Sequence, residues 1–164
     1  MTLIGVASLR PEETVPLPWS EINEMLAPGS KADVFKVAAL ARTSNLPETL
    51  EWRLVGHADT KVLASLAGAT KREGIQRTLF EKRNLSWAIA YCLAANNILP
   101  HDLYEQFVRE DMPPWPILTI VFFNSASSLE LKREILARVK ATKDNFGLKP
   151  YEVEAMEKWL AERA

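Results

Sequence analysis

The sequence predicts an all-α fold, a short α-solenoid in which helical hairpins of about 26–28 residues stack on one another. The first observation that supports this prediction is a repeated ten-residue sequence pattern. The stretches Ala41–Leu50 and Ala94–Leu103 carry alanine, asparagine, proline and leucine in the same order. The second is the spacing of leucine and alanine in each unit, which matches one face of a helix. The third is the atypical composition of both ends, because a solenoid needs different end units to cover its core.

We expect one domain, because 164 residues is an ordinary domain size. It divides into an N-terminal cap over residues 1–29, repeats over residues 30–143 and a C-terminal capping helix over residues 144–164. No apolar stretch approaches the roughly 18 residues that a membrane span needs, and residues 1–9 lack the pattern of a secretory signal. These features predict a cytoplasmic chain that does not contact a membrane.

The N-terminal cap and the first hairpin are predicted from their prolines and capping residues. One short helix is expected from about Ser20 to Leu26 in the proline-rich cap. Ser30 and Asp33 have the spacing of a capping box, and a helical apolar pattern follows them. Pro47 suits the first position of the next helix, where its missing N–H costs nothing.

The second and third hairpins follow the same order of cap, helix, turn and helix. Asp59 is expected to cap the third helix, and a fourth helix is expected from about Lys71 to Lys82. Ser86 is expected to cap a fifth helix, and Pro100 to begin a sixth.

Residues 117–123 are the ambiguous segment, because isoleucine, valine and phenylalanine favour a buried strand. Their place in the repeat is instead that of a first helix, and a single strand would have no partner, so we predict a helix. Ser127 and Glu130 predict a capping box for a longer helix after it. Pro150 is expected to begin the last helix.

The order Leu-Ala, Asn, Leu-Pro, Leu and Leu, followed by a turn and the next helix, resembles the variant leucine-rich repeat. More loosely, it resembles HEAT-like α-solenoids. The resemblance covers roughly residues 31–140. The units here are longer than in that family, and the cysteine cluster that accompanies some of its members is absent. The resemblance implies a superhelical binding scaffold and transfers no activity and no functional residue.

The sequence contains none of the short motifs that mark catalytic, nucleotide-binding or metal sites. The two histidines, His57 and His101, lack a partner at metal-ligand spacing. The single cysteine, Cys92, lies in an apolar run, where we expect it to be a small buried side chain. We therefore predict a protein that is not an enzyme and has no catalytic residue, metal site or cofactor.

Two basic stretches, on predicted second helices two units apart, form the candidate binding surface. In HEAT-like solenoids the second helices line the concave face, so these stretches would form two basic ridges. Three interpretations stay open: solvation of a helix face, contact with an acidic protein, or contact with nucleic-acid phosphates. The basic residues of this surface are Lys71, Arg72, Arg77, Arg83, Lys132, Arg133 and Arg138.

The tryptophans give a further candidate. Trp52, Trp87 and Trp159 have apolar neighbours in the sequence, which predicts core positions. Trp115 is framed by prolines, and it is either a plug between units or an exposed anchor for a partner. Our leading expectation is a protein-binding or regulatory adaptor that uses its concave face. The alternative is a nucleic-acid-binding HEAT-like protein that uses the basic ridges.

Overall fold

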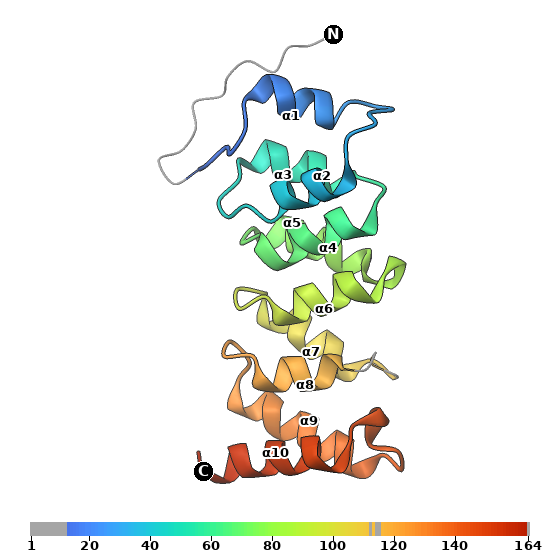
Figure 1. Ribbon diagram of the computed structural model, residues 1–164. Coiled ribbons are helices and arrows are strands. Elements are labelled where there is room, and N and C mark those ends of the chain that lie inside the picture. Colours follow the sequence, from blue (N-terminus) through green and yellow to red (C-terminus); the bar gives the residue numbers. More distant parts are fainter. Residues whose placement is uncertain (1–12, 112, 114–115, 164) are drawn as a thin grey trace. The chain divides into compact units, whose positions relative to one another are not determined.

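The computed structural model is entirely helical over the residues that it describes, which are 13–111, 113 and 116–163. Within them, ten α-helices and two short 3-10 helices follow one another, and there is no strand (Figure 1). The prediction of an all-α protein is therefore confirmed. None of the helices in this part of the chain combines the length and the apolar character that crossing a membrane requires.

The Cα positions divide the chain into two compact units, with the boundary between Ile89 and Ala90. This boundary lies inside α6, Trp87–Ala95. The two units are described separately below. The expectation that residues 1–164 form one domain stays a prediction.

The first unit contains a short N-terminal helix and two helix pairs. Helix α2 packs on α4, and α3 packs on α4 and α5. The bounds are α1 Trp19–Met25, α2 Val34–Ala41, α3 Glu48–Val55, α4 Thr60–Ala69, α5 Glu73–Glu81 and the 3-10 helix η1 Arg83–Leu85.

The second unit contains most of α6 and the helices after it. Helix α8 packs on α7 and on α9, and α10 packs on α9. The bounds are α7 His101–Arg109, α8 Ile117–Phe123, α9 Leu129–Ala141, the 3-10 helix η2 Asn145–Gly147 and α10 Pro150–Ala161. Helix α8 confirms the prediction that residues 117–123 are helical. Their place in the sequence pattern was a better guide than their strand-like composition.

Several predicted helix starts are confirmed by their capping contacts. The Asp59 carboxylate accepts a hydrogen bond from the N–H of Lys61 at 2.8 Å, and α4 begins directly after it. Pro150 is the first residue of α10, where a proline loses no hydrogen bond. Pro47 and Pro100 were expected at the first position of a helix, and this is wrong by one residue, because they are the N-caps of α3 and α7.

Two predicted capping boxes are wrong in detail. Asp33, not Ser30, caps α2, and its carboxylate accepts from the N–H of Phe35 at 2.9 Å. Ser128, not Ser127, caps α9, while the Ser127 hydroxyl donates to the carbonyl of Val121 at 2.5 Å. In both cases the open N–H groups of the helix are bonded by a capping side chain further along the chain than predicted. The helix therefore begins one to three residues later than the sequence pattern indicated.

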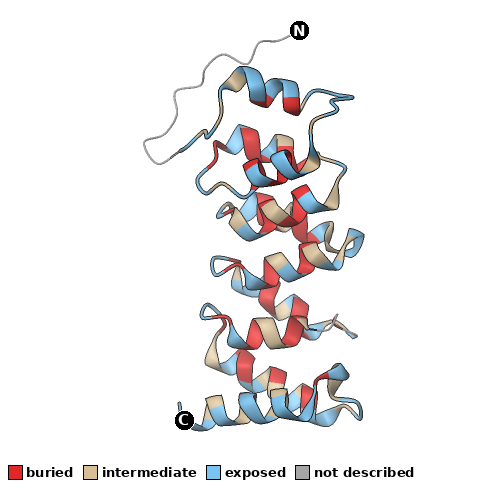
Figure 2. Ribbon diagram, viewed as in Figure 1, coloured by how far each residue is buried: buried red, intermediate tan, exposed pale blue. Residues whose placement is uncertain are grey.

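The repeated leucine and alanine positions form the core. Buried residues lie along the helix sides that face other helices of the same unit, and the outward sides are exposed (Figure 2). The first helix of each pair buries two adjacent residues at its C-terminal end: Leu40 and Ala41, Leu66 and Ala67, Leu93 and Ala94, and Val121 and Phe122.

The prediction that the tryptophans pack in the core is wrong for two of them. Trp52 is 43% exposed and Trp87 is 68% exposed, while Trp159 is half-buried. Trp52 lies two positions after the buried Leu50, which places the two side chains on opposite sides of α3. Cys92 is half-buried and not fully buried as expected. Apolar neighbours in the sequence did not indicate which side of the helix each residue occupies.

Candidate functional site

Helices α3, α5, α7 and α9 are the second helices of the four helix pairs. Each of them buries one polar side chain at the same position relative to its buried apolar residues. The residue comes directly after the first buried apolar residue of the helix. All four are at most 4% exposed: Glu51 in α3, Gln76 in α5, Tyr104 in α7 and Lys132 in α9. A polar group in such a place is costly unless it has a hydrogen-bond partner.

Three of these side chains donate to the carbonyl that ends the preceding helix. The Gln76 amide donates to Thr70 O at 3.1 Å, and the Lys132 ammonium donates to Asn124 O at 2.9 Å. The Tyr104 hydroxyl donates in the same way to Asn96 O. The last carbonyls of a helix have no partner within it, so these donors satisfy them and hold the two helices of a pair together.

Glu51 is the exception, because an ionised carboxylate only accepts hydrogen bonds. Its Oε2 lies 2.8 Å from Nε of Arg72, the residue before α5, in an ion pair without the alignment of a hydrogen bond. Burial raises the pKa of the Glu51 carboxyl, and the Thr70 hydroxyl and the Arg72 guanidinium oppose that rise. Glu51 therefore contacts a residue of the next helix pair, whereas Gln76, Tyr104 and Lys132 each contact the first helix of their own pair.

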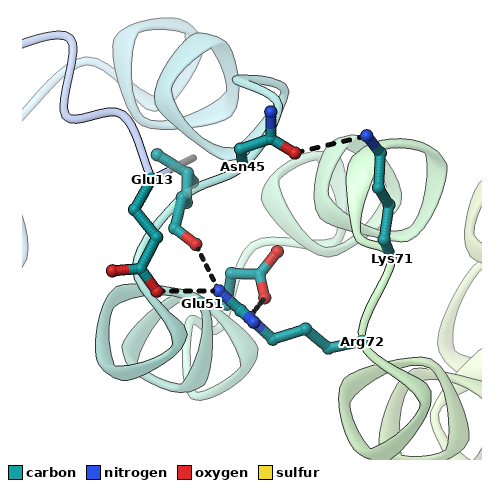
Figure 3. Close-up of a pocket in the computed structure, with 6 residues that line it drawn as sticks. Glu13, Asn45, Glu51, Lys71 and Arg72 are labelled. Carbon is teal, nitrogen blue, oxygen red and sulfur yellow. Dashed lines mark hydrogen bonds and ion pairs between the residues drawn. The ribbon is translucent and has the colours of Figure 1, made fainter. Parts of the chain in front are cut away.

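Arg72 joins this carboxylate to two further acceptors (Figure 3). Its Nη2 donates to the carbonyl of Leu46 at 2.9 Å and to Oε1 of Glu13 at 3.1 Å. The Arg72 side chain is 25% exposed, and those of Glu13 and Glu51 are 9% and 5% exposed. The guanidinium is thus held by three residues, Glu13, Leu46 and Glu51, that are all distant from it in the sequence.

The chain at residues 13–14 lies against the turn between α2 and α3. The N–H of Thr14 donates to Asn45 O at 2.8 Å, and the Thr14 hydroxyl donates to Ser44 O at 2.9 Å. Lys71 Nζ donates to Oδ1 of Asn45 at 3.2 Å. A pocket of about 170 Å³ lies here, lined by Glu13, Asn45, Leu46, Glu51, Lys71 and Arg72.

In the first unit, the structure brings Lys71 and Arg72 to this pocket and gives the other two predicted basic residues separate partners. Nη2 of Arg77 lies 2.8 Å from Glu73, one helical turn earlier in α5. The Arg83 guanidinium lies 4.0 Å from the ring of Phe80 and donates to the Phe80 carbonyl at 2.9 Å.

In the second unit, the predicted basic residues differ strongly in exposure. Lys132 is 3% exposed, so it is not a surface residue as expected. Its Nζ lies 4.4 Å from the centre of the Trp159 ring, and burial lowers the pKa of its ammonium group. Arg138 donates to Glu110 O at 3.0 Å. Arg133 is exposed, and Trp115 lies outside the described residues.

A surface that the sequence did not indicate surrounds Trp52 on α3. A β-carbon at Gly74 of α5 would lie 3.6 Å from Cζ2 of Trp52, so the indole lies close to the start of α5. The indole N–H points to Oε1 of Glu48 at 3.5 Å. We call Glu48, Trp52 and Gly74 the Trp52 surface. The position of Trp52 on the side opposite Leu50 is the signal that could have revealed it.

The described residues contain no group of three or more histidine, cysteine, aspartate or glutamate side chains that could hold a metal ion. A scan against protein-family models, a search of curated proteins and a search of solved structures each found no match.

Proposed function

We propose that this chain is a non-enzymatic binding scaffold, a protein-binding or regulatory adaptor that recognises a protein partner with its second helices. Trp52 carries the proposal: it is 43% exposed, yet it lies against Gly74 of the next second helix. Tryptophan and arginine are enriched at the residues that dominate protein–protein binding energy. A tryptophan already held in place also loses less conformational freedom when a partner covers it.

The proposal includes a short α-solenoid of stacked hairpins, related in kind to the variant leucine-rich and HEAT-like repeats. In the first unit, side chains of one pair contact the pair before it at separations of 26 or 27 residues. These contacts are Lys71 to Asn45, Arg72 to Leu46, and Lys82 to Val55. Contacts one repeat apart support this arrangement, because a solenoid repeat contacts only its neighbours.

The alternative, nucleic-acid binding by the basic ridges, has weaker support. Phosphate binding depends on lysine and arginine side chains that solvent can reach. Arg72 and Arg138 are half-buried and bonded within the chain, and Lys132 is buried. Among the described residues of the predicted set, Lys71 and Arg133 are exposed, and the partly exposed Arg77 is already paired with Glu73.

Cytoplasmic localisation belongs to the same proposal. The chain has a single cysteine, so it forms no internal disulfide, as suits a reducing compartment.

A quantitative pull-down tests the Trp52 surface. The full chain, Trp52→Ala and the control Trp87→Ala are immobilised, exposed to a lysate of the native host, and the retained proteins are quantified. Proteins held by the full chain and by Trp87→Ala are expected to fall about tenfold on Trp52→Ala, the loss of about 1.4 kcal/mol of binding energy. Equal retention by all three proteins would overturn the proposal.

A binding titration with labelled duplex and single-stranded DNA tests the alternative. Binding that strengthens as the salt concentration falls and weakens in Arg133→Glu would favour it.

A further inference from the structure

We propose that the turn between α2 and α3 forms, with Arg72, a recognition notch for an extended peptide segment that carries a glutamate or aspartate, and that Glu13 and Thr14 of this chain occupy the notch in cis. The Arg72 notch is defined by Ser44, Asn45, Leu46, Glu51, Lys71 and Arg72. This inference rests on the proposed function, because it names the chemistry of a partner segment.

The backbone contacts are those of an extended peptide. Asn45 O accepts the N–H of Thr14 at 2.8 Å, and Ser44 O accepts the Thr14 hydroxyl at 2.9 Å. Main-chain hydrogen bonds of this kind recognise any extended segment, and side-chain contacts add specificity.

The acidic specificity comes from Arg72, which stays in place when Glu13 leaves. The guanidinium is held independently by Leu46 O at 2.9 Å and by the Glu51 carboxylate at 2.8 Å. Without Glu13, the notch contains two cationic groups and one carboxylate, so a single incoming carboxylate restores the balance. Charge-assisted hydrogen bonds of this kind are about twice as strong as neutral ones.

The acceptors in the notch favour a peptide over a phosphate group. Asn45 O and Ser44 O accept hydrogen bonds from the N–H and the hydroxyl of Thr14, so the occupied notch uses donors as well as a carboxylate. A phosphate diester has no donor to offer. The pattern therefore fits an acidic residue followed by serine or threonine.

The notch also has room beside Glu13. The pocket of about 170 Å³ is about ten times the roughly 10–15 Å³ that, on the same measure, holds one water molecule. A partner segment can therefore place more than a single carboxylate against these residues. Residues 13–14 are then the internal competitor that a partner displaces.

Fluorescence anisotropy with a labelled peptide tests the notch in the full-length protein. The probe is Arg-Pro-Glu-Glu-Thr-Val-Pro-Leu, the sequence of residues 10–17. The variant Glu13→Ala/Thr14→Ala removes the side chains of the internal occupant. It is expected to bind the probe at least about tenfold more tightly than the unaltered chain, in which the tethered segment competes at millimolar effective concentration.

A second peptide and two further protein variants isolate the chemistry. Replacing the probe's second glutamate by glutamine is expected to weaken binding about tenfold, and this control does not depend on a variant folding. Arg72→Lys in the double variant is expected to weaken it similarly, since lysine lacks the guanidinium fork. Trp87→Ala in the double variant is expected to leave the affinity unchanged, because Trp87 is exposed and belongs to neither the Trp52 surface nor the notch.

The outcomes separate this inference from the proposed function. No binding to the double variant, or equal binding of both peptides, overturns the notch. Equal binding to the unaltered chain and the double variant overturns occupancy by Glu13 and Thr14. If the probe binds as expected while Trp52→Ala retains every protein in the pull-down, the notch stands and the Trp52 surface fails.

Discussion

Replacing Arg72 by methionine should leave the Glu51 carboxylate buried without its cation. The Glu51 side chain is 5% exposed, and Arg72 Nε lies 2.8 Å from its Oε2. Methionine keeps much of the side-chain volume and removes the charge. The fold then has to accommodate either an ionised carboxylate in a poor environment or a protonated one.

The expected loss of unfolding free energy at pH 8 is about 3 kcal/mol. Removing one member of a buried ion pair typically costs 3–5 kcal/mol, and the low end applies because a quarter of the Arg72 side chain is exposed. About 1 kcal/mol of this comes from the lost hydrogen bond to Leu46 O. The rest comes from the uncompensated carboxylate.

The loss should depend on pH in a direction that the carboxylate sets. Burial raises the pKa of Glu51 in the folded state above its ordinary value of 4.5. A raised folded pKa means that the group favours folding when protonated and that this stability is lost as pH rises through the folded pKa. Removing Arg72 raises that pKa further. The loss should therefore shrink from about 3 kcal/mol at pH 8 to about 1 kcal/mol near pH 4.5, where only the lost hydrogen bond counts.

Urea unfolding followed by circular dichroism at both pH values measures this loss. Arg72→Met is compared with Glu51→Gln, with the double variant Glu51→Gln/Arg72→Met, and with Arg77→Met as a control. Arg77 also pairs with a glutamate, but the pair is solvent-exposed and should contribute less than about 0.5 kcal/mol. In the double variant the uncharged amide needs no cation, so its loss should be about 2 kcal/mol smaller than the sum of the two single losses. Equal losses at both pH values, or additive losses, would refute this account of Glu51.

Three other substitutions test the buried polar position and the Trp52 surface. Tyr104→Phe removes the hydroxyl that bonds Asn96 O and the Asn124 amide, and should cost about 1–2 kcal/mol by thermal unfolding. Burial raises the pKa of Tyr104 to about 12, so a spectrophotometric titration of the folded chain should show one tyrosine that ionises only near that pH. Lys132→Ala should cost about 2–3 kcal/mol in urea unfolding, whereas the exposed Lys140→Ala should cost under about 0.5 kcal/mol. Gly74→Ala should stabilise the chain by about 0.5 kcal/mol in the same assay, because a β-carbon there meets Trp52 at an ordinary contact distance of 3.6 Å.

The helices were predictable because the residues that begin and end each helix lie next to it in the sequence. Proline, asparagine and capping residues mark where each helix begins or ends, and the leucine and alanine spacing marks its buried side. Residues 117–123 show the strength of this pattern, since their place in the repeat gave the correct structure against their strand-like composition. The capping residues of α2 and α9 were misplaced because adjacent side chains compete for the same N–H groups.

Lys71 and Arg72 were predicted as binding residues, but the partners that gather around them were not, because those residues are distant in the sequence and chemically unlike. Arg72 contacts residues 13, 46 and 51, and no local sequence pattern relates these positions to one another. The buried polar position is filled by glutamate, glutamine, tyrosine and lysine, so residue type gives no signal. Only alignment of the second helices by their buried apolar residues reveals it.

Glu51 links the fold to the proposed binding site. A donor at this position closes its own helix pair, as Gln76 and Lys132 do through the carbonyl that ends the preceding helix. An acid cannot make that bond when ionised, so it holds Arg72 from the next pair instead. The same guanidinium then reaches Leu46 O and the carboxylate of Glu13. A change from donor to acceptor at one repeated position thus presents a fixed guanidinium beside two acceptor carbonyls, which is the arrangement that an acidic peptide segment requires.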